Sequence, residues 1–255
     1  MHRVAAFTIV ELLVVVTIIV VLLSLLAPAM DKAVGYAMEA RCLSNLHQIG
    51  IGLRMYTADY HGYFPPKYTP GTNTSGMFVE GQGVPGTTNT VSIYWWVGTA
   101  GTTAPFDAHG ANERYVNPYL GYGRAGPKSP VPVASCPGDN DAVRYYDSVG
   151  TSYASNHSFS MSSLMAKRAI PPDPVVSGTF YSAIKISRVQ SASRLVAGAD
   201  VPGLRAGWNL APPSPSWHRE DTYALVRVDG HATMEYFTWG DTSGPDYTFD
   251  ETGRE

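Results

Sequence analysis

The architecture of this chain is decided near its N terminus, where residues 7–30 read FTIVELLVVVTIIVVLLSLLAPAM. From Leu12 to Met30 no residue carries a formal charge. At the rise of an α-helix this run spans about 28 Å, close to the roughly 30 Å thickness of the hydrocarbon core of a bilayer. The sequence therefore predicts a membrane-spanning helix at this end of the chain.

One carboxylate, Glu11, lies at the start of the apolar run. An ionised side chain inside a membrane costs about 2.5–3.5 kcal/mol on insertion scales, so such a residue usually has a partner and a function. One interpretation is a plain membrane anchor in which Glu11 reaches the interface. A secretory signal fits less well, because its apolar core spans about 7–15 residues and is followed by a small-residue cleavage site. The run here is longer, and residues 27–29, APA, imitate such a site poorly.

The N-terminal pattern resembles the type IV pilin and type II secretion pseudopilin superfamily. A short basic leader precedes Phe7, a glutamate follows Phe7 by four residues, and Pro28 stands near the end of the apolar helix. The resemblance implies that a prepilin peptidase cuts between Ala6 and Phe7 and that the new amino group of Phe7 is methylated. Ala6 stands where the family usually has Gly, to which it is nearest in size. Proline inside a helix removes a backbone donor and clashes with the preceding turn, so we expect a kink at Pro28.

In this family the glutamate has a role in assembly. The resemblance implies that Glu11 is neutralised by the α-amino group of Phe7 on a neighbouring subunit, which satisfies two charges and sets the register between helices. The implied protein is a non-enzymatic structural subunit without cofactor. It begins as a single-pass inner-membrane protein and ends in a periplasmic or cell-surface filament, either a type IV pilus or a secretion pseudopilus. Its implied partners are other pilin or pseudopilin subunits, the prepilin peptidase and an inner-membrane assembly platform.

The helix is expected to continue beyond the membrane. Between Asp31 and Tyr60 apolar side chains recur every three or four residues, which predicts one buried face of an amphipathic helix. Residues 61–62, His-Gly, and 65–66, Pro-Pro, end it. The predicted buried stripe consists of Leu43, Leu46, Ile49, Leu53, Tyr56 and Tyr60, whereas Asp31, Glu39, Arg41, Arg54 and Asp59 lie mostly off it.

Composition describes the rest of the chain. The 255 residues include 25 glycines and 19 prolines, which is typical of a loop-rich extracytoplasmic domain with short strands. Net charge is −3 and only 15% of residues are charged, so no nucleic-acid surface is predicted. We expect an α+β, pilin-like fold in which a long spine helix packs on an antiparallel sheet with long loops. Its parts are a leader at 1–6, a transmembrane and assembly helix at 7–30, an amphipathic spine at 31–62 and a β-rich globular domain at 63–255.

The clearest strand signal is a hairpin centred on Asp229-Gly230, which lies between two β-prone runs. A two-residue turn pairs Val228 with His231, Leu225 with Met234 and Tyr223 with Tyr236. In that register the apolar face placed against the spine helix consists of Tyr223, Leu225, Ala232, Met234 and Tyr236. Residues 194–199, RLVAGA, are expected to form a neighbouring strand.

Further segments resemble a bacterial pilin-like family that is abundant in planctomycetes and their relatives. Residues 41–50 read RCLSNLHQIG and residues 63–66 read YFPP. The family often has a Cys-Pro-x-Asp segment, matched at 136–139, and ends in His, nine residues and Asp-Gly. In this chain ten residues separate His218 from Asp229-Gly230, so the signature carries a one-residue insertion.

The two cysteines, Cys42 and Cys136, would meet an oxidising compartment in an exported domain. A bridge between them would tie the helix to the domain, but their spacing leaves the pairing open. They form no close cysteine pair, and no two histidines have the i, i+4 spacing of a zinc site. An exported enzyme using His218, Asp229 and His231 is a third interpretation, and it requires these side chains to converge.

Two acidic segments suggest calcium, since hard cations prefer oxygen ligands. They contain Asp139 and Asp141, and then Asp241, Asp246, Asp250, Glu251 and Glu255. Neither has the spacing of a dedicated calcium loop, so solvated acidic loops are the favoured interpretation. A membrane-anchored protein that binds carbohydrate or a matrix polymer is the alternative to a filament subunit. Its aromatic candidates are Tyr94, Trp95 and Trp96, for which core packing is the favoured role.

Overall fold

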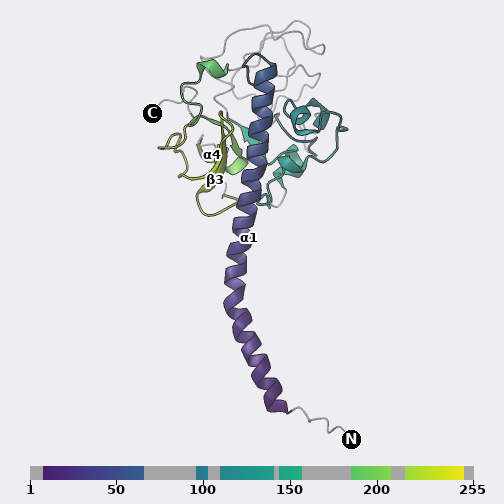
Figure 1. The fold of residues 1–255 in the computed structure, drawn as a ribbon, viewed down its shortest axis with the longest axis vertical. Helices are drawn as coiled ribbons and strands as arrows, with labels where there is room; N and C mark the ends of the chain where they lie inside the picture. The colour runs from purple at the N-terminus through teal and green to yellow at the C-terminus, as the bar shows by residue number, and fades with distance from the viewer. Residues whose placement is uncertain are drawn as a thin grey trace.

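The computed structural model describes residues 8–65, 96–102, 110–140, 144–156, 185–207 and 216–249. Its dominant element is the helix α1, Ile9–Asp59, which is 51 residues long. Figure 1 shows the C-terminal half of α1 running through the globular domain, while its N-terminal half extends away from the domain. The predicted apolar segment and the predicted spine are therefore parts of one continuous helix.

The C-terminal end of α1 coincides with the predicted stop at 61–62. Tyr60 is the last residue before the turn, and His61 and Gly62 both have positive φ, +57° and +84°. The amide of Gly62 donates to the carbonyl oxygen of Thr57 at 2.6 Å, a bond typical of a Schellman cap. This bond satisfies one of the last helical carbonyl groups and turns the chain sharply out of the helix.

A four-stranded antiparallel sheet, in the order β1-β2-β3-β4, forms the centre of the domain. The architecture is therefore α+β, as expected. The strands are β1 Tyr153–Ser155, β2 Val196–Asp200, β3 Thr222–Arg227 and β4 Ala232–Tyr236. The short helices and turns are α2 Tyr145–Val149, α4 Val201–Gly207, η2 Ala111–Glu113, η3 Asn117–Leu120, η4 Pro132–Ala134 and η5 Ile186–Arg188.

The helix α1 lies between the sheet and the segment that contains η2, η3 and η4 (Figure 1). Two glycines of α1 permit close contact on these two sides. A methyl group on Gly50 would lie 2.9 Å from Val226 and from Gly230, whereas one on Gly52 would lie 2.7 Å from Val116 near η3. The spine half of α1 is thus the centre of the core.

The other face of β3 packs against α4 and a cluster of aromatic rings. A methyl group on Gly203 of α4 would lie 2.7 Å from Cβ of Tyr223. The ring of Tyr223 lies 4.6 Å from that of Phe237, which in turn lies 4.9 Å from Tyr247 and 5.8 Å from Phe249. All residues of β3 are consequently buried, as expected for a strand covered on both faces.

The predicted hairpin exists, but its predicted register is wrong by one residue. The observed pairs include Thr222 with Tyr236, Ala224 with Met234 and Val226 with Ala232. The reason is the turn, which contains residues 228–230 rather than two residues. The amide of Gly230 donates to the carbonyl of Arg227 at 2.9 Å, and Gly230 has φ +87°, the geometry of a type I turn followed by a glycine bulge.

The shifted register changes which side chains face α1. Val226 lies against Gly50 of α1, so Ala224, Ala232 and Met234, which share its face, lie on the α1 side of the sheet. Tyr223 and Leu225, which were predicted on this side, lie on the opposite face. A one-residue slip exchanges the faces of a strand, which explains the error.

Other predictions for the core are confirmed in part. The residues Leu46, Ile49, Leu53 and Tyr56 are buried on α1, whereas Leu43 and Tyr60 are only partly buried. Glu39, predicted off the buried face, is 6% exposed. The predicted strand at 194–199 corresponds to β2, which begins and ends slightly later.

Candidate functional site

The most prominent candidate site is the half of α1 that extends away from the domain. Its large apolar side chains are exposed from Ile9 to Met30, with Ile9 at 85% and Leu25 at 71%. By length and composition this helix could cross a membrane once, and none of its most apolar window is buried within the molecule. Soluble proteins rarely expose so large an apolar surface without a partner.

The structure places Glu11 in the first turn of α1, where it forms a capping box with Thr8. The Thr8 hydroxyl accepts from the Glu11 amide at 3.2 Å, and Oε2 of Glu11 accepts from both the amide and the hydroxyl of Thr8, each at 2.8 Å. Thr8 was not singled out from the sequence, although Thr-x-x-Glu before an apolar run is the signature of this motif. Ala6 and Phe7, the predicted cleavage and methylation residues, lie outside the described residues.

Pro28 lies inside α1, which continues through it as a helix. Figure 1 shows a gradual curve in the N-terminal half of the helix rather than a break. The ring of Pro28 removes one backbone donor from the helix, and neighbouring turns can absorb the resulting change in direction. The apolar half of α1 is therefore continuous with the half that packs in the domain.

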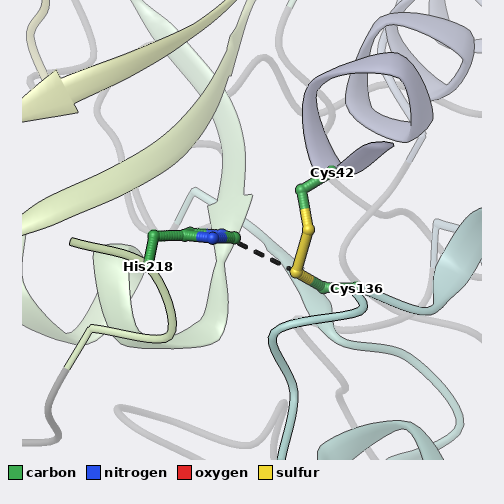
Figure 2. A group of neighbouring side chains, drawn as sticks. All are labelled: Cys42, Cys136 and His218. Atoms are coloured by element: carbon green, nitrogen blue, oxygen red, sulfur yellow. Dashed lines mark hydrogen bonds between the residues drawn. A yellow bond between two sulfur atoms is a disulfide. The ribbon is translucent and has the colours of Figure 1, made fainter. Parts of the chain in front are cut away.

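The second candidate site surrounds the cysteines. Cys42 of α1 and Cys136, which follows η4, form a disulfide with a Cα–Cα distance of 5.2 Å. The bridge that the sequence left open thus joins the helix to the domain. Figure 2 shows the imidazole of His218 pointing at this disulfide, with its Nε2 3.7 Å from Sγ of Cys136. Nε2 also lies 3.4 Å from Oδ2 of Asp200 at the end of β2.

This cluster of four residues is shielded from solvent. Cys42, Cys136 and Asp200 are fully buried, and the His218 side chain is 1% exposed. Asp200 accepts from the amides of Gly203 and Ala224, at 2.9 Å and 3.1 Å, which fixes its carboxylate between α4 and β3. Asp200 was missed in the sequence, where nothing marks a carboxylate at the end of a strand 18 residues before His218 as its neighbour.

Further polar contacts hold α1 to the domain on both sides of the disulfide. Nε of Arg219 donates to Oε1 of Glu39 at 2.8 Å, and this hydrogen bond raises the pKa of Arg219. Asn45 donates to the carbonyl of Ser135 at 2.9 Å and to the hydroxyl of Tyr153 at 3.3 Å. Burial raises the pKa of Tyr153 above its ordinary value, so its hydroxyl keeps its proton in mildly alkaline solution as well.

The Asp229-Gly230 turn lies further along α1. Nη1 of Arg54 donates to the backbone carbonyl of Asp229 at 3.0 Å, and Oδ1 of Asp229 accepts from the amide of His231 at 2.9 Å. Twelve helical residues separate Arg54 from Cys42, a rise of about 18 Å. Asp229 and the exposed His231 therefore lie far from His218, and the structure does not bring together the three residues of the enzyme interpretation.

The acidic residues considered for calcium have other roles where they are described. Both oxygens of Asp139 accept hydrogen bonds, from the amides of Tyr145 and Tyr146 and the hydroxyl of Ser152, at 2.6–2.9 Å. Asp139 therefore caps the start of α2. Asp241 accepts from the amide and the hydroxyl of Thr238, which lowers the pKa of its carboxyl group.

The remaining calcium candidates contribute little to a site. Asp246 contributes its backbone carbonyl to Nε of Arg227. Asp141, Asp250, Glu251 and Glu255 lie outside the described residues. Within the described ranges, the group of three metal-donor side chains that converges is Cys42, Cys136 and His218.

Of the three aromatic residues considered for carbohydrate binding, the structure describes one. Trp96 is buried, and its ring lies 6.3 Å from that of Phe64. This position supports the favoured role in the core. Tyr94 and Trp95 lie outside the described residues.

Comparisons of the chain with protein-family models, with curated proteins and with solved structures find no match.

Proposed function

We propose that this chain is a structural subunit, a pilin or pseudopilin, of a type IV pilus-like or type II secretion filament. A prepilin peptidase removes residues 1–6, and the subunit assembles through the N-terminal half of α1. The observation that carries the proposal is the exposure of the apolar side chains from Ile9 to Met30 on a helix whose other half is fixed in a folded domain.

The physical chemistry of that surface supports two successive environments. Burying one large aliphatic side chain is favourable by about 1.5–3 kcal/mol, so a surface of this size requires a cover. The inner membrane covers it before assembly, since the apolar run matches the thickness of a bilayer. In the filament, the same helices from neighbouring subunits cover one another.

The position of Glu11 agrees with an assembly contact. Its capping bonds to Thr8 both use Oε2, and within the described residues Oε1 has no hydrogen-bond partner. Oε1 can therefore accept from the α-amino group of Phe7 on a neighbouring subunit without loss of the cap. Such pairing neutralises two charges in an apolar environment and sets the axial register.

The attachments of α1 support a mechanical role for the domain. The domain is attached to α1 at several positions along the helix. These attachments include the Cys42–Cys136 disulfide, the Glu39–Arg219 ion pair and the Arg54–Asp229 hydrogen bond. The domain would then form the outer surface of the filament at a fixed offset from the helical core.

The second candidate is a membrane-anchored protein that binds carbohydrate or a matrix polymer. It predicts an exposed aromatic platform. Of the described tryptophans, Trp96 and Trp217 are 8% and 9% exposed and Trp239 is partly buried. The exposed tyrosines Tyr36 and Tyr236 lie on different elements, α1 and β4. The filament subunit therefore remains the proposal that the described residues support best.

The substitution Glu11→Ala tests the proposal in the native host. We expect the variant to remain in the inner membrane but to be lost from the sheared or secreted filament fraction, since the amino group of Phe7 no longer has a partner. The matched control is Glu220→Ala, which removes an exposed carboxylate from the domain and should leave incorporation unchanged. Wild-type incorporation of Glu11→Ala would contradict the assembly role.

A further inference from the structure

The cluster of Cys42, Cys136, His218 and Asp200 has no part in the proposed assembly contact. It lies on the spine half of α1, away from the apolar half, and it is buried. Its imidazole and carboxylate are more than a disulfide requires, because a disulfide is itself apolar and packs well against aliphatic side chains. Asp200 is explained by the amides of Gly203 and Ala224 that it binds, so the histidine is the group that needs its own explanation.

The two ring nitrogens of His218 have different environments. One ring nitrogen, Nε2, is directed at Cys136 and Asp200, whereas the other, Nδ1, is buried and has no hydrogen-bond partner among the described residues. A buried polar atom without a partner costs about 1–3 kcal/mol. The contact with Oδ2 of Asp200 explains Nε2, but it leaves the buried Nδ1 unexplained.

The donor atoms lie close enough to share one metal ion once the bond between the two sulfurs is broken and the sulfurs move apart. The two sulfurs and the imidazole nitrogen all lie within 4.8 Å of one another. In a tetrahedral zinc site, with bonds of about 2.3 Å to sulfur and about 2.0 Å to nitrogen, sulfur and nitrogen lie roughly 3.5 Å apart. The distance between Nε2 of His218 and Sγ of Cys136 is 3.7 Å, which agrees with this geometry.

We propose that Cys42, Cys136 and His218 bind Zn²⁺ when their disulfide is reduced, with Asp200 beside the fourth position. A dithiol reductant supplies two electrons, its own sulfurs form a disulfide, and the Cys42–Cys136 bond breaks to give two thiols. Zn²⁺ then binds the two thiolates and Nε2, and two protons leave to solvent. Helix α1 is joined to the domain by a covalent bond in one state and by a metal in the other.

A groove on the surface lies next to the cluster, so an ion that enters it comes close to His218. It has a volume of about 480 Å³ and lies between α1 and residues 217–219. His218 lines it together with Glu39 and Trp217, and the buried imidazole of His218 lies against the disulfide.

Cobalt titration of the full-length chain in detergent micelles tests this proposal. The disulfide is reduced with a phosphine, the phosphine is removed without oxygen, and Co²⁺ is added as a spectroscopic substitute for Zn²⁺. We expect one equivalent to bind with the visible bands of tetrahedral cobalt and a thiolate charge-transfer band, and Zn²⁺ to abolish both. The oxidised chain should show neither band.

The substitution His218→Ala separates a folded site from simple chelation by two thiols. Its fold is first checked by circular dichroism in the oxidised state, where the disulfide still joins α1 to the domain. After reduction we expect at least about tenfold weaker cobalt binding and loss of the tetrahedral bands. The control His47→Ala, which removes an exposed histidine of α1, should bind as the wild type does.

Two results would overturn the proposal. One is equal cobalt affinity and equal spectra for the reduced wild type and His218→Ala, which would mean that the thiols bind metal without the imidazole. The other is a reduced wild-type chain, folded or not, that shows no tetrahedral cobalt bands at any ratio of metal to protein.

Discussion

At the scale of single residues, glycine decides how closely α1 approaches its neighbours. Gly50 faces the hairpin, and a methyl group there would lie 2.9 Å from Cα and O of Gly230. Gly35 lies in the same helix, but a methyl group there would have no neighbour within 4 Å. The two positions therefore have similar backbones and opposite environments.

We expect Gly50→Ala to lower the free energy of unfolding by about 1–3 kcal/mol, because the backbone of the hairpin must move to admit the methyl group. Gly35→Ala should cause no loss, since alanine is the better helix former by about 1 kcal/mol. Denaturant unfolding of both variants in micelles, followed by near-ultraviolet circular dichroism, checks the difference. Equal stabilities of the two variants would contradict the close contact between α1 and the hairpin.

Buried tyrosines make the domain sensitive to high pH. Burial raises the pKa of Tyr223 to about 12 and that of Tyr247 to about 12. The unfolded chain ionises both near pH 10, while the folded chain keeps both protons, so the unfolded state binds fewer protons between these values. Stability is therefore retained below about pH 10 and falls as pH rises toward 12.

Unfolding midpoints in denaturant, measured at about pH 8 and about pH 11, check this expectation. The variant Tyr223→Phe should lose less stability between the two conditions than the wild type does. A midpoint that does not change between the two conditions would contradict the burial of these hydroxyl groups.

At the scale of elements, the turn between β3 and β4 depends on Gly230. Its φ of +87° belongs to the left-handed region, which costs other residues roughly 1–2 kcal/mol. A methyl group there would also lie 3.2 Å from Cδ of Arg54. The turn is therefore restricted both by its backbone and by its contact with α1.

We expect Gly230→Ala to lower the thermal midpoint of the domain, with a loss in the free energy of unfolding of about 1–2 kcal/mol. The control is Gly126→Ala, where φ is not in the left-handed region and the nearest atom, Oγ of Ser129, lies 3.4 Å away. It should remain within about 0.5 kcal/mol of the wild type. Thermal unfolding measures both, and an equally stable Gly230→Ala would contradict the observed turn geometry.

The same elements indicate how far the sequence could predict this fold. The extent of α1 follows from local signals, an apolar run, a helical stripe and a stop at 61–62, so it was predicted. The hairpin position was predicted by Asp229-Gly230, but its register was not, because Asp-Gly fits both a two-residue turn and a three-residue turn with a glycine bulge. In the observed register Val226 and Gly230 lie against Gly50 of α1, a contact between distant segments that no local signal predicts.

Contacts between distant segments could not be predicted from the sequence either, because they depend on tertiary packing. Glu39 is buried because Arg219, 180 residues away, pairs with it. His218 and both cysteines were singled out, yet their pairing and the neighbouring Asp200 depend on how three separate segments meet. Periodicity and turn chemistry describe neighbouring residues in the sequence. They do not predict contacts between segments that are far apart in the chain.

At the scale of the whole molecule, the two halves of α1 have different partners. The half from Ile9 to Met30 is exposed, and the half that follows contains all the buried residues of the helix, from Glu39 to Thr57. The apolar half thus contributes no burial to the domain. Stability and membrane attachment should therefore be separable.

Removal of residues 1–30 tests this separation. We expect residues 31–255 to be soluble and to retain the Cys42–Cys136 disulfide. They should also unfold at the same denaturant midpoint as the full chain in micelles, because no core contact is lost. Gel filtration and circular dichroism are the measurements. Aggregation or loss of tertiary structure in this fragment would show that the apolar half is needed for folding.

The proposed filament subunit requires that the chain be processed before Phe7, because only the freed amino group of Phe7 can pair with Glu11 of a neighbour. Mass spectrometry of the N-terminal peptide, taken from protein isolated from the native host, tests it most directly. The account predicts a chain that begins at N-methylated Phe7, without residues 1–6. A chain that still begins at Met1 would contradict it.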